Sequence, residues 1–207
     1  MGVFSIRFID IVCYYAKVSI KDYKIIFIHG YTASSSQNWY PRIAPLLTNV
    51  GVEFVVPDMP GDTHPHAQAW LDIIQREVQK STKPIILVGH SLGTRAALLY
   101  LDQYKQPIAG ALLIAPFANW TANAERRSGL AYPDFFEHSL DITEIRKLCP
   151  NFVIIHSIDD DHIDYAQGKE IAEQLGANFI TVDGRKHMSA PENANIIFEV
   201  LRDHVLL

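Results

Sequence analysis

The sequence predicts a doubly wound α/β fold, with a mainly parallel sheet of about six or seven strands and helices on both faces. Short apolar runs recur along the chain, and a longer amphipathic segment follows each of them. The runs show no polar alternation, as expected of strands that are buried on both faces. Regular alternation of strand and helix is typical of a parallel sheet with right-handed crossovers. Because no repeat or linker divides the chain, we expect residues 1–207 to form a single domain.

Each predicted strand is a short run rich in Ile, Val, Leu and Phe. These strands cover residues 24–29, 52–57, 84–89, 110–115, 151–156 and 178–182. Helical patterns fill the gaps between them, at residues 39–50, 67–80, 91–103, 141–148, 165–175 and 192–204. Gly51 and Gly176 stand where a helix ends and the next strand begins, a position that favours left-handed glycine. Ligands of such sheets bind at the carboxyl ends of the strands, so chemistry is expected directly after each run.

Composition and charge exclude several classes of protein. The 207 residues carry 18 Lys and Arg against 23 Asp and Glu, a formal net charge of −5, which gives no reason to expect a nucleic-acid partner. The longest apolar stretches are far shorter than the roughly 20 residues of a membrane span. Arg7, Asp10 and Lys17 interrupt any signal-peptide core, so we expect an unprocessed cytoplasmic protein without a membrane partner.

The motif Gly89-His90-Ser91-Leu92-Gly93 matches G-x-S-x-G, between a predicted strand and a predicted helix. This is the setting of a nucleophile elbow, in which a tight turn lifts the serine hydroxyl clear of the sheet. Glycines on either side leave room for the neighbouring strand and helix. The helix N-terminus below the serine favours developing negative charge. We therefore expect Ser91 to be a catalytic nucleophile rather than a helix-capping serine.

A serine nucleophile needs a base and a carboxylate that orients the base, in the chain order Ser, Asp or Glu, His. His187, in the loop after the last predicted strand, has the position of the base. The carboxylate would come from the loop after residues 151–156, which holds Asp159, Asp160, Asp161 and Asp164. At least one of these aspartates is expected to cap the following helix. A cation site built from Asp159, Asp161 and His162 is an alternative that lacks the further ligands of calcium or zinc sites.

An oxyanion hole needs two backbone N–H donors aimed at the developing alkoxide. We expect one donor to be the N–H of Leu92, directly after the nucleophile. The second is expected from the loop after the first strand, where Gly30 permits a sharp turn and Tyr31 supplies the N–H. With a single glycine, this loop does not fit a phosphate cradle of a nucleotide-binding protein. The two cysteines, Cys13 and Cys149, exclude a disulfide framework and a cysteine-ligated zinc site, so no cofactor is expected.

Several segments together resemble the YdeN-type small serine hydrolases, a family that includes the animal retinoblastoma-binding serine hydrolases. They are HGYTASSSQNWYPRIAPLL, VVPDMPG, ILVGHSLGTRAALLYL, SIDDDHIDYAQGKEIAEQLGA and the His187 loop, in that order from about Ile25 to the C-terminus. The resemblance implies a compact α/β-hydrolase fold with a Ser-His-Asp triad and little or no lid. Carried over by position, the nucleophile is Ser91, the base His187 and the acid Asp160.

Two features depart from this resemblance. Residues 1–23 precede it, and they are expected to add an edge strand or hairpin, or to be partly disordered. The L-x-C-x-E motif for retinoblastoma binding is absent, since the nearest stretch reads Lys147-Leu148-Cys149-Pro150. That protein interaction therefore does not transfer to this chain.

The function predicted from the sequence is acyl transfer to water, by a carboxylesterase that takes small acyl esters. Peptidase or thioesterase activity with the same triad, on amide or thioester substrates, stays open. So do a haloperoxidase-like or lyase-type enzyme and a non-catalytic interaction module that keeps the fold. Four aromatic side chains between the fourth and fifth strands either wall an acyl pocket or belong to the core: Trp120, Tyr132, Phe135 and Phe136.

Overall fold

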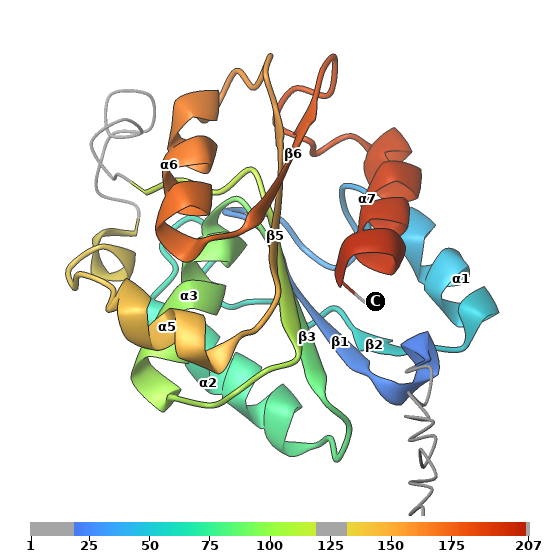
Figure 1. The fold of residues 1–207 in the computed structure, drawn as a ribbon, viewed down its shortest axis with the longest axis horizontal. Helices are drawn as coiled ribbons and strands as arrows, with labels where there is room; N and C mark the ends of the chain where they lie inside the picture. The colour runs from blue at the N-terminus through green and yellow to red at the C-terminus, as the bar shows by residue number, and fades with distance from the viewer. Residues whose placement is uncertain (1–18, 119–131, 206–207) are drawn as a thin grey trace, which may run out of the picture.

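The computed structural model describes residues 19–118 and 132–205, which are built around one six-stranded sheet (Figure 1). Its strand order is β2-β1-β3-β4-β5-β6, and every pair of neighbours is parallel. The strands are β1 (Lys24–Ile28), β2 (Glu53–Val55), β3 (Ile85–His90), β4 (Gly110–Ile114), β5 (Phe152–Ser157) and β6 (Asn178–Val182). The doubly wound parallel sheet predicted from the sequence is confirmed.

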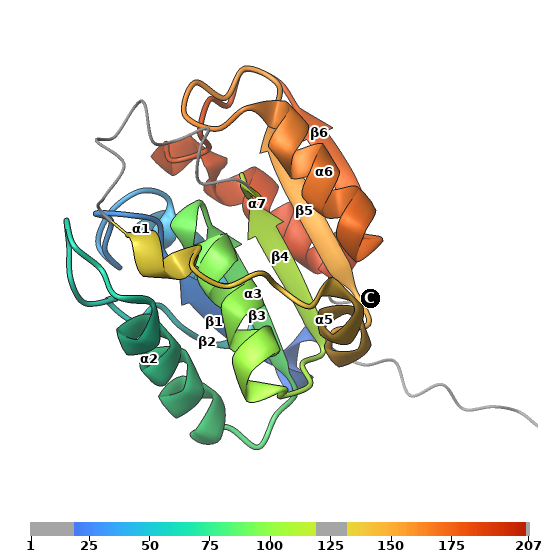
Figure 2. The same cartoon turned by 90° about the vertical axis from the view of Figure 1, so that its left-hand side faces the viewer.

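Helices cover both faces of this sheet. Helices α1 (Tyr40–Val50) and α7 (Ala194–Val200) lie on one face (Figure 1). The other face carries α2 (Ala67–Gln79), α3 (Leu92–Tyr104), α5 (Ile142–Leu148) and α6 (Tyr165–Leu175), which stand in front of the sheet in Figure 2. Gly51 and Gly176 end α1 and α6 in left-handed conformations, with φ of 72° and 66°, as predicted.

The C-terminal helix is less regular than the sequence pattern indicates. A 3₁₀ turn, η3 (Pro191–Asn193), precedes α7, and a π-type turn, η4 (Leu201–Val205), follows it. The π-type turn keeps both Leu201 and Val205 buried against the sheet. Gly110 of β4 makes room for this packing, because an added Cβ would lie 3.0 Å from Val205 Cγ1. Two further 3₁₀ turns are η1 (Ile20–Asp22) and η2 (Pro133–Phe135).

The apolar core consists of two clusters, one on each face of the sheet. In β1, Ile25 and Phe27 pack towards α1 and α7, whereas Ile26 and Ile28 pack towards α2 and α3. All four side chains are fully buried, which explains why the strand reads as a continuous apolar run. Each such side chain stabilises the fold by about 1.5–3 kcal/mol before the entropy of ordering is subtracted.

The strand order creates a switch point at the carboxyl ends of β1 and β3. The chain leaves β1 through α1 to reach β2 on one side, then returns through α2 to β3 on the other side. The loop after β1 leads to α1 on one face of the sheet and the loop after β3 leads to α3 on the other face, so the two loops diverge at this point. Such a switch point is where ligands of open α/β sheets bind. The fold therefore brings the segment after Ile28 beside the turn at Ser91.

Some predictions concern residues that the structure does not describe, and others concern properties that it does not test. Residues 1–18, most of the predicted N-terminal extension, lie outside the described residues, and η1 begins directly after them with a capping box between Ser19 and Asp22. Within the described ranges, no helix combines the length and the apolar character that crossing a bilayer requires. The cytoplasmic location and the single-domain organisation stay predictions.

Candidate active site

Ser91 occupies a strained turn between β3 and α3. Its backbone has φ 53° and ψ −120°, a conformation that non-glycine residues rarely adopt. The Ser91 N–H donates to the Ile114 carbonyl of β4 at 2.9 Å, which anchors the turn to the sheet. A strained serine at the carboxyl end of a central strand is the geometry of a nucleophile elbow.

Two glycines make the turn sterically possible. A Cβ at Gly89 would lie 2.6 Å from the Gly93 carbonyl oxygen, and one at Gly93 would lie 2.1 Å from the Ile28 carbonyl oxygen of β1. Both distances are far below van der Waals contact, and the obstructing atoms are backbone. The G-x-S-x-G spacing therefore follows from the close approach of β1, β3 and α3.

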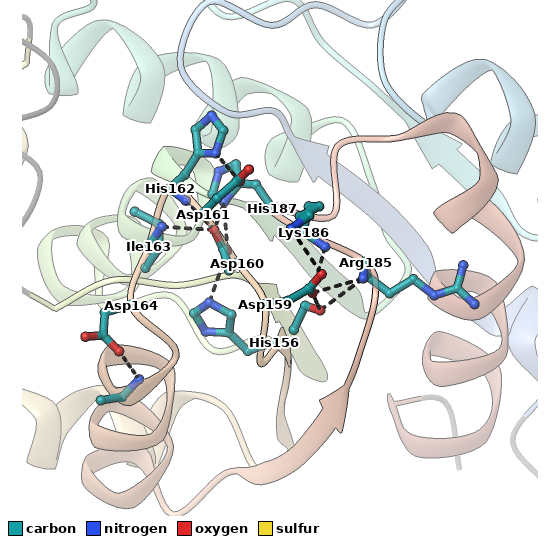
Figure 3. Close-up of polar contacts among 12 residues, drawn as sticks. His156, Asp159, Asp160, Asp161, His162, Ile163, Asp164, Arg185, Lys186 and His187 are labelled. Carbon is teal, nitrogen blue, oxygen red and sulfur yellow. Dashed lines mark hydrogen bonds and ion pairs between the residues drawn. The ribbon is translucent and has the colours of Figure 1, made fainter.

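His187 and Asp160 meet above the carboxyl ends of β5 and β6 (Figure 3). His187 Nδ1 lies 2.9 Å from Asp160 Oδ2 and 3.2 Å from Oδ1. Since an ionised carboxylate only accepts, Nδ1 carries the proton and Nε2 is the nitrogen that can accept one. The two loops thus bring together His187 and Asp160, the pair that the family resemblance implied, and orient the imidazole.

The four aspartates of the β5–α6 loop have different partners in Figure 3. Asp160 hydrogen-bonds to His187, and its side chain is fully buried. Asp159 accepts hydrogen bonds from the Arg185 and Lys186 N–H groups, at 3.1 and 3.0 Å, and joins the two loops. Asp161 pairs with His162 Nδ1 at 2.7 Å. Asp164 caps α6 by accepting from the Ala166 N–H, which confirms that one aspartate of the cluster is a helix cap.

Asp160 is held as a buried anion. Burial by itself would raise the pKa of its carboxyl, but hydrogen bonds from His156 and His187 outweigh that effect. With the added contribution of the Ile163 N–H, they hold the pKa of Asp160 well below its usual range. At Asp159 the hydrogen bond from the Ser157 hydroxyl is the largest cause that lowers the pKa, to about 2. Both groups are therefore carboxylates at neutral pH.

His156 is the site residue that sequence reasoning missed. It lies on β5, it is fully buried, and its Nε2 is 3.1 Å from Asp160 Oδ2. A histidine at the end of an otherwise apolar strand, four residues before an aspartate, was the available signal. A buried polar side chain at the carboxyl end of a strand needs a partner, and here the partner is Asp160.

Ser91 and His187 line one open cleft of about 660 Å³ at the switch point. The other lining residues come from the loop after β1, the end of β3, the loop after β5 and the loop after β6: Gly30, Tyr31, Thr32, Ala33, Gln37, Asn38, His90, His162 and Ser189. Most of these side chains are polar. Ser91 itself is only 4% exposed, so a reactant has to enter the cleft to reach its hydroxyl.

The two predicted oxyanion donors border the nucleophile. Leu92 is the first residue of α3, so its N–H has no carbonyl partner within the helix. Gly30 brings the loop after β1 against Ser91, since an added Cβ would lie 3.2 Å from the Ser91 Cβ. Tyr31 follows directly, and its hydroxyl donates to the Thr63 carbonyl at 2.8 Å, which fixes the loop.

A cation site at these histidines is not favoured by the geometry. Ligand atoms of Asp160, His162 and His187 lie within 4.8 Å of one another. However, the rings of His162 and His187 are stacked, with centroids 4.7 Å apart and 14° between planes. Lone pairs of imidazole nitrogens lie in the ring planes, so those of two stacked rings do not converge on one ion. The alternative of Asp159, Asp161 and His162 is not brought together as a ligand group among the described residues.

Of the aromatic residues proposed for an acyl pocket, those that the structure describes do not line the cleft of Ser91. Phe135 is fully buried against Trp70, and Tyr132 is buried in the same core cluster. The Tyr132 ring lies 5.0 Å from that of Tyr31, so it supports the cleft from behind. Phe136 borders a separate cavity beside α3 and α6. Trp120 lies outside the described residues.

His90, next to the nucleophile, makes stability depend on pH. The pKa of His90 is lowered from 6.5 to about 3, mainly because the side chain is buried and secondly because of the nearby charge of His187. The unfolded chain therefore binds more protons than the folded one between about pH 3 and 6.5, so the free energy of unfolding rises with pH across this window. We expect up to about 1.4 kcal/mol per pH unit from this residue, lost as pH falls from 6.5.

Urea unfolding at several pH values in this window tests the expectation. The control is His90→Gln, which keeps an N–H donor for the His187 carbonyl that His90 Nε2 now contacts at 2.9 Å. The variant should show a flatter pH dependence than the wild type. Equal slopes for the two proteins would contradict the assignment.

Comparison with known proteins agrees with this geometry. The profile of the serine hydrolase family matches residues 25–195. YdeN of Bacillus subtilis (strain 168) is 27% identical over 186 residues, covering 87% of this chain and 95% of YdeN. The serine hydrolase RBBP9 of Rattus norvegicus is 26% identical over 165 residues, covering 79% of this chain and 84% of RBBP9.

Solved structures share the fold. The crystal structure of YdeN superposes with a TM-score of 0.78 and 27% identity, over 87% of this chain and 97% of that one. A carboxylesterase structure from Nitrososphaera gargenis gives a TM-score of 0.71 at 12% identity, over 89% of this chain and 90% of the other, which supports the fold alone. The resemblance read from the sequence is thereby confirmed. Because the family profile covers the chain from β1 to the start of α7, the protein belongs to the serine hydrolase family.

Proposed function

We propose that the protein is a carboxylesterase of small acyl esters that works through an acyl-enzyme on Ser91. The observation that carries the proposal is the shared cleft, which joins a serine on a strained elbow to the imidazole that Asp160 orients. A serine hydroxyl alone is a weak nucleophile, and this arrangement supplies the base that activates it. The proposed substrate is a small molecule.

In the proposed mechanism, Ser91 Oγ attacks the acyl carbon while His187 Nε2 takes the hydroxyl proton. The N–H groups of Tyr31 and Leu92 stabilise the negative charge on the carbonyl oxygen. When the tetrahedral adduct collapses, the bond to the alcohol breaks and His187 returns the proton to the leaving oxygen. A water molecule then loses a proton to His187 and attacks the acyl carbon. When this second adduct collapses, the bond to Ser91 Oγ breaks and His187 returns the proton to Oγ, which releases the acid and restores the Ser91 hydroxyl. Asp160 keeps the imidazole in the required tautomer throughout.

The lining of the cleft favours short acyl groups. Thr32, Gln37, Asn38 and Ser189 present polar side chains around the nucleophile, and the cleft is open rather than tunnel-shaped. A long acyl chain gains affinity only where apolar surface covers its methylene groups. We therefore place esters of short acids before long-chain lipids. Thioesters and peptide amides of the same small size are the second candidates, since Ser91, His187 and Asp160 could act in the same way on an ester, a thioester or an amide.

Labelling with a fluorophosphonate probe tests whether the serine is activated. The purified wild type should form a covalent adduct, and Ser91→Ala and His187→Ala should not. Ser81→Ala, at the opposite end of β3, is the matched serine control and should label like the wild type. Absence of labelling of a folded wild type would refute the hydrolase proposal and favour the non-catalytic interaction module.

A series of p-nitrophenyl esters then tests the substrate class. We expect kcat/KM for acetate and butyrate to exceed that for laurate by about tenfold or more. The methylene groups of a long chain would displace water from the polar side chains that line the cleft, without replacing the hydrogen bonds of that water. The same series as thioesters and anilides ranks the alternative bonds. Preference for laurate, or faster cleavage of anilides than of esters, would overturn the assignment of small acyl esters.

A further inference from the structure

The Asp160 carboxylate contacts two imidazoles, those of His156 and His187, and the proposed mechanism uses only His187. Oδ2 of Asp160 lies 2.9 Å from His187 Nδ1 and 3.1 Å from His156 Nε2 (Figure 3). His187 lines the cleft, whereas His156 does not border it and is fully buried on β5. The second imidazole therefore contacts the acid from the side of the sheet, opposite to His187, which borders the cleft.

The carboxylate is fully enclosed by hydrogen-bond donors. Oδ1 accepts from the backbone N–H groups of His162 and Ile163, at 2.8 and 2.9 Å, and Oδ2 accepts from the two imidazoles. Its side chain has no exposed surface, so bulk water cannot replace a missing donor. A buried anion is stable only when its hydrogen-bonding capacity is met, and His156 supplies a donor that no other described side chain provides besides His187.

His156 is itself clamped in one orientation. Gly168 of α6 lies against the ring, and an added Cβ there would be 2.2 Å from His156 Nδ1. The ring of Tyr165 contacts it edge-on, with centroids 5.8 Å apart. Nδ1 has no hydrogen-bond partner among the described residues, so Asp160 is the polar partner that fixes the ring. A histidine confined in this way between β5 and α6 holds its Nε2–H at a set position.

We propose that His156 is a positioning residue of the acyl-transfer site, which fixes the Asp160 carboxylate through an Nε2–H···Oδ2 hydrogen bond so that Asp160 in turn holds His187. The inference rests on the proposed function of Ser91, His187 and Asp160. Without the His156 donor, Oδ2 keeps only its hydrogen bond with His187, so the carboxylate is held less firmly and more of its charge acts on His187. His156 does not touch the cleft, so its loss should affect kcat and leave KM unchanged.

Three substitutions at His156 separate the effect of losing the hydrogen-bond donor from the effect of changing the packing of the side chain. His156→Phe keeps a ring but removes the donor, and His156→Asn carries an amide that is too short to reach Asp160. His156→Gln places its amide N–H close to the position of Nε2. We expect kcat to fall about 10- to 100-fold in the first two, the equivalent of a hydrogen bond to a charged group, with KM within about twofold of wild type. His156→Gln should recover kcat to within about threefold.

The pH profile provides a readout that lost packing would not change. Removing a donor from the carboxylate leaves more of its charge to attract a proton on His187, so the acidic limb of kcat/KM should move to higher pH in His156→Phe and return in His156→Gln. Tyr165→Phe is the matched control. It disturbs the neighbouring side chain, whose hydroxyl contacts Thr181, but leaves the donor in place, and it should behave as wild type.

The outcomes distinguish this inference from the proposed function. If the folded wild type does not react with the fluorophosphonate probe, the proposed function fails. If it reacts and His156→Phe shows the same kcat and the same acidic limb, the positioning role is overturned. Equal loss in the Gln and Phe variants, both folded by circular dichroism, also overturns it. Should the variants not fold, ¹H–¹⁵N spectra of the wild type decide, because the proposal requires His156 protonated on Nε2 and a proton on Nδ1 alone contradicts it.

Discussion

Replacing Asp160 by Asn is expected to lower kcat by about 10⁴-fold, the loss typical of a triad acid changed to its amide. The Asn carbonyl can still accept from the Ile163 N–H, so the loop keeps its shape. The amide nitrogen, however, is a donor that faces the His187 Nδ1–H. His187 must then adopt the other tautomer, with its proton on Nε2, and can no longer accept a proton from Ser91.

Asp159→Asn is the matched control, since it alters the neighbouring aspartate by the same atom. Its carboxylate contacts the Arg185 and Lys186 N–H groups and an ion-paired Lys186 ammonium 3.5 Å away, none of which reacts. We expect kcat within about tenfold of wild type, because the loop is loosened but the tautomer of His187 is not changed. Steady-state ester hydrolysis measures both variants. A larger loss in Asp159→Asn than in Asp160→Asn would show that the acid has been assigned to the wrong aspartate.

Gly93→Ala is expected to cause the largest loss of stability in the elbow. The added Cβ would lie 2.1 Å from the Ile28 carbonyl oxygen and 2.8 Å from that of His29. These atoms cannot give way easily, because β1 is paired on both sides, with β2 and β3. Overpacking against backbone costs about 3 kcal/mol or more, so we expect either a strongly lowered free energy of unfolding or no folded protein.

Gly184→Ala is the control for Gly93→Ala, measured by the same urea unfolding experiment. Gly184 has φ +69°, and an added Cβ would meet nothing within 4 Å. The expected cost is therefore backbone strain alone, about 1–2 kcal/mol. Equal destabilisation by the two substitutions would contradict the close packing of β1 against the elbow.

Local sequence patterns predicted the strands and the elbow because those features depend on neighbours along the chain. In β1 the run Ile25–Ile28 is apolar at every position because both faces of the strand are buried, and that leaves a signal in the sequence. Gly89 and Gly93 are required because an added Cβ would lie less than 3 Å from backbone atoms, of Gly93 and Ile28 respectively. Although the contact of Gly93 is with another strand, the requirement is recorded in the short G-x-S-x-G spacing. The C-terminal helix was predicted as one element because its apolar pattern does not distinguish an α-turn from the π-type turn at Leu201–Val205.

The choice among the aspartates could not be made from the residues alone. Asp159 and Asp160 are adjacent, and both are followed by suitable helix and strand patterns. Backbone direction at the end of β5 turns Asp160 inwards to His187 and Asp159 towards the Lys186 N–H. The family resemblance implied Asp160, which is the aspartate that the structure places in hydrogen-bonding contact with His187.

The sequence by itself determined the order of strands and helices, the elbow at Ser91 and the loop that holds His187, because each is encoded by spacing within a short segment. Only the tertiary structure decided what crosses between segments. It paired Asp160 with His187 across 27 positions and buried His156 beneath them. It also placed Tyr132 behind Tyr31 instead of in an acyl pocket. Such contacts depend on how β-strands and loops approach one another in space, for which the local sequence carries no periodicity.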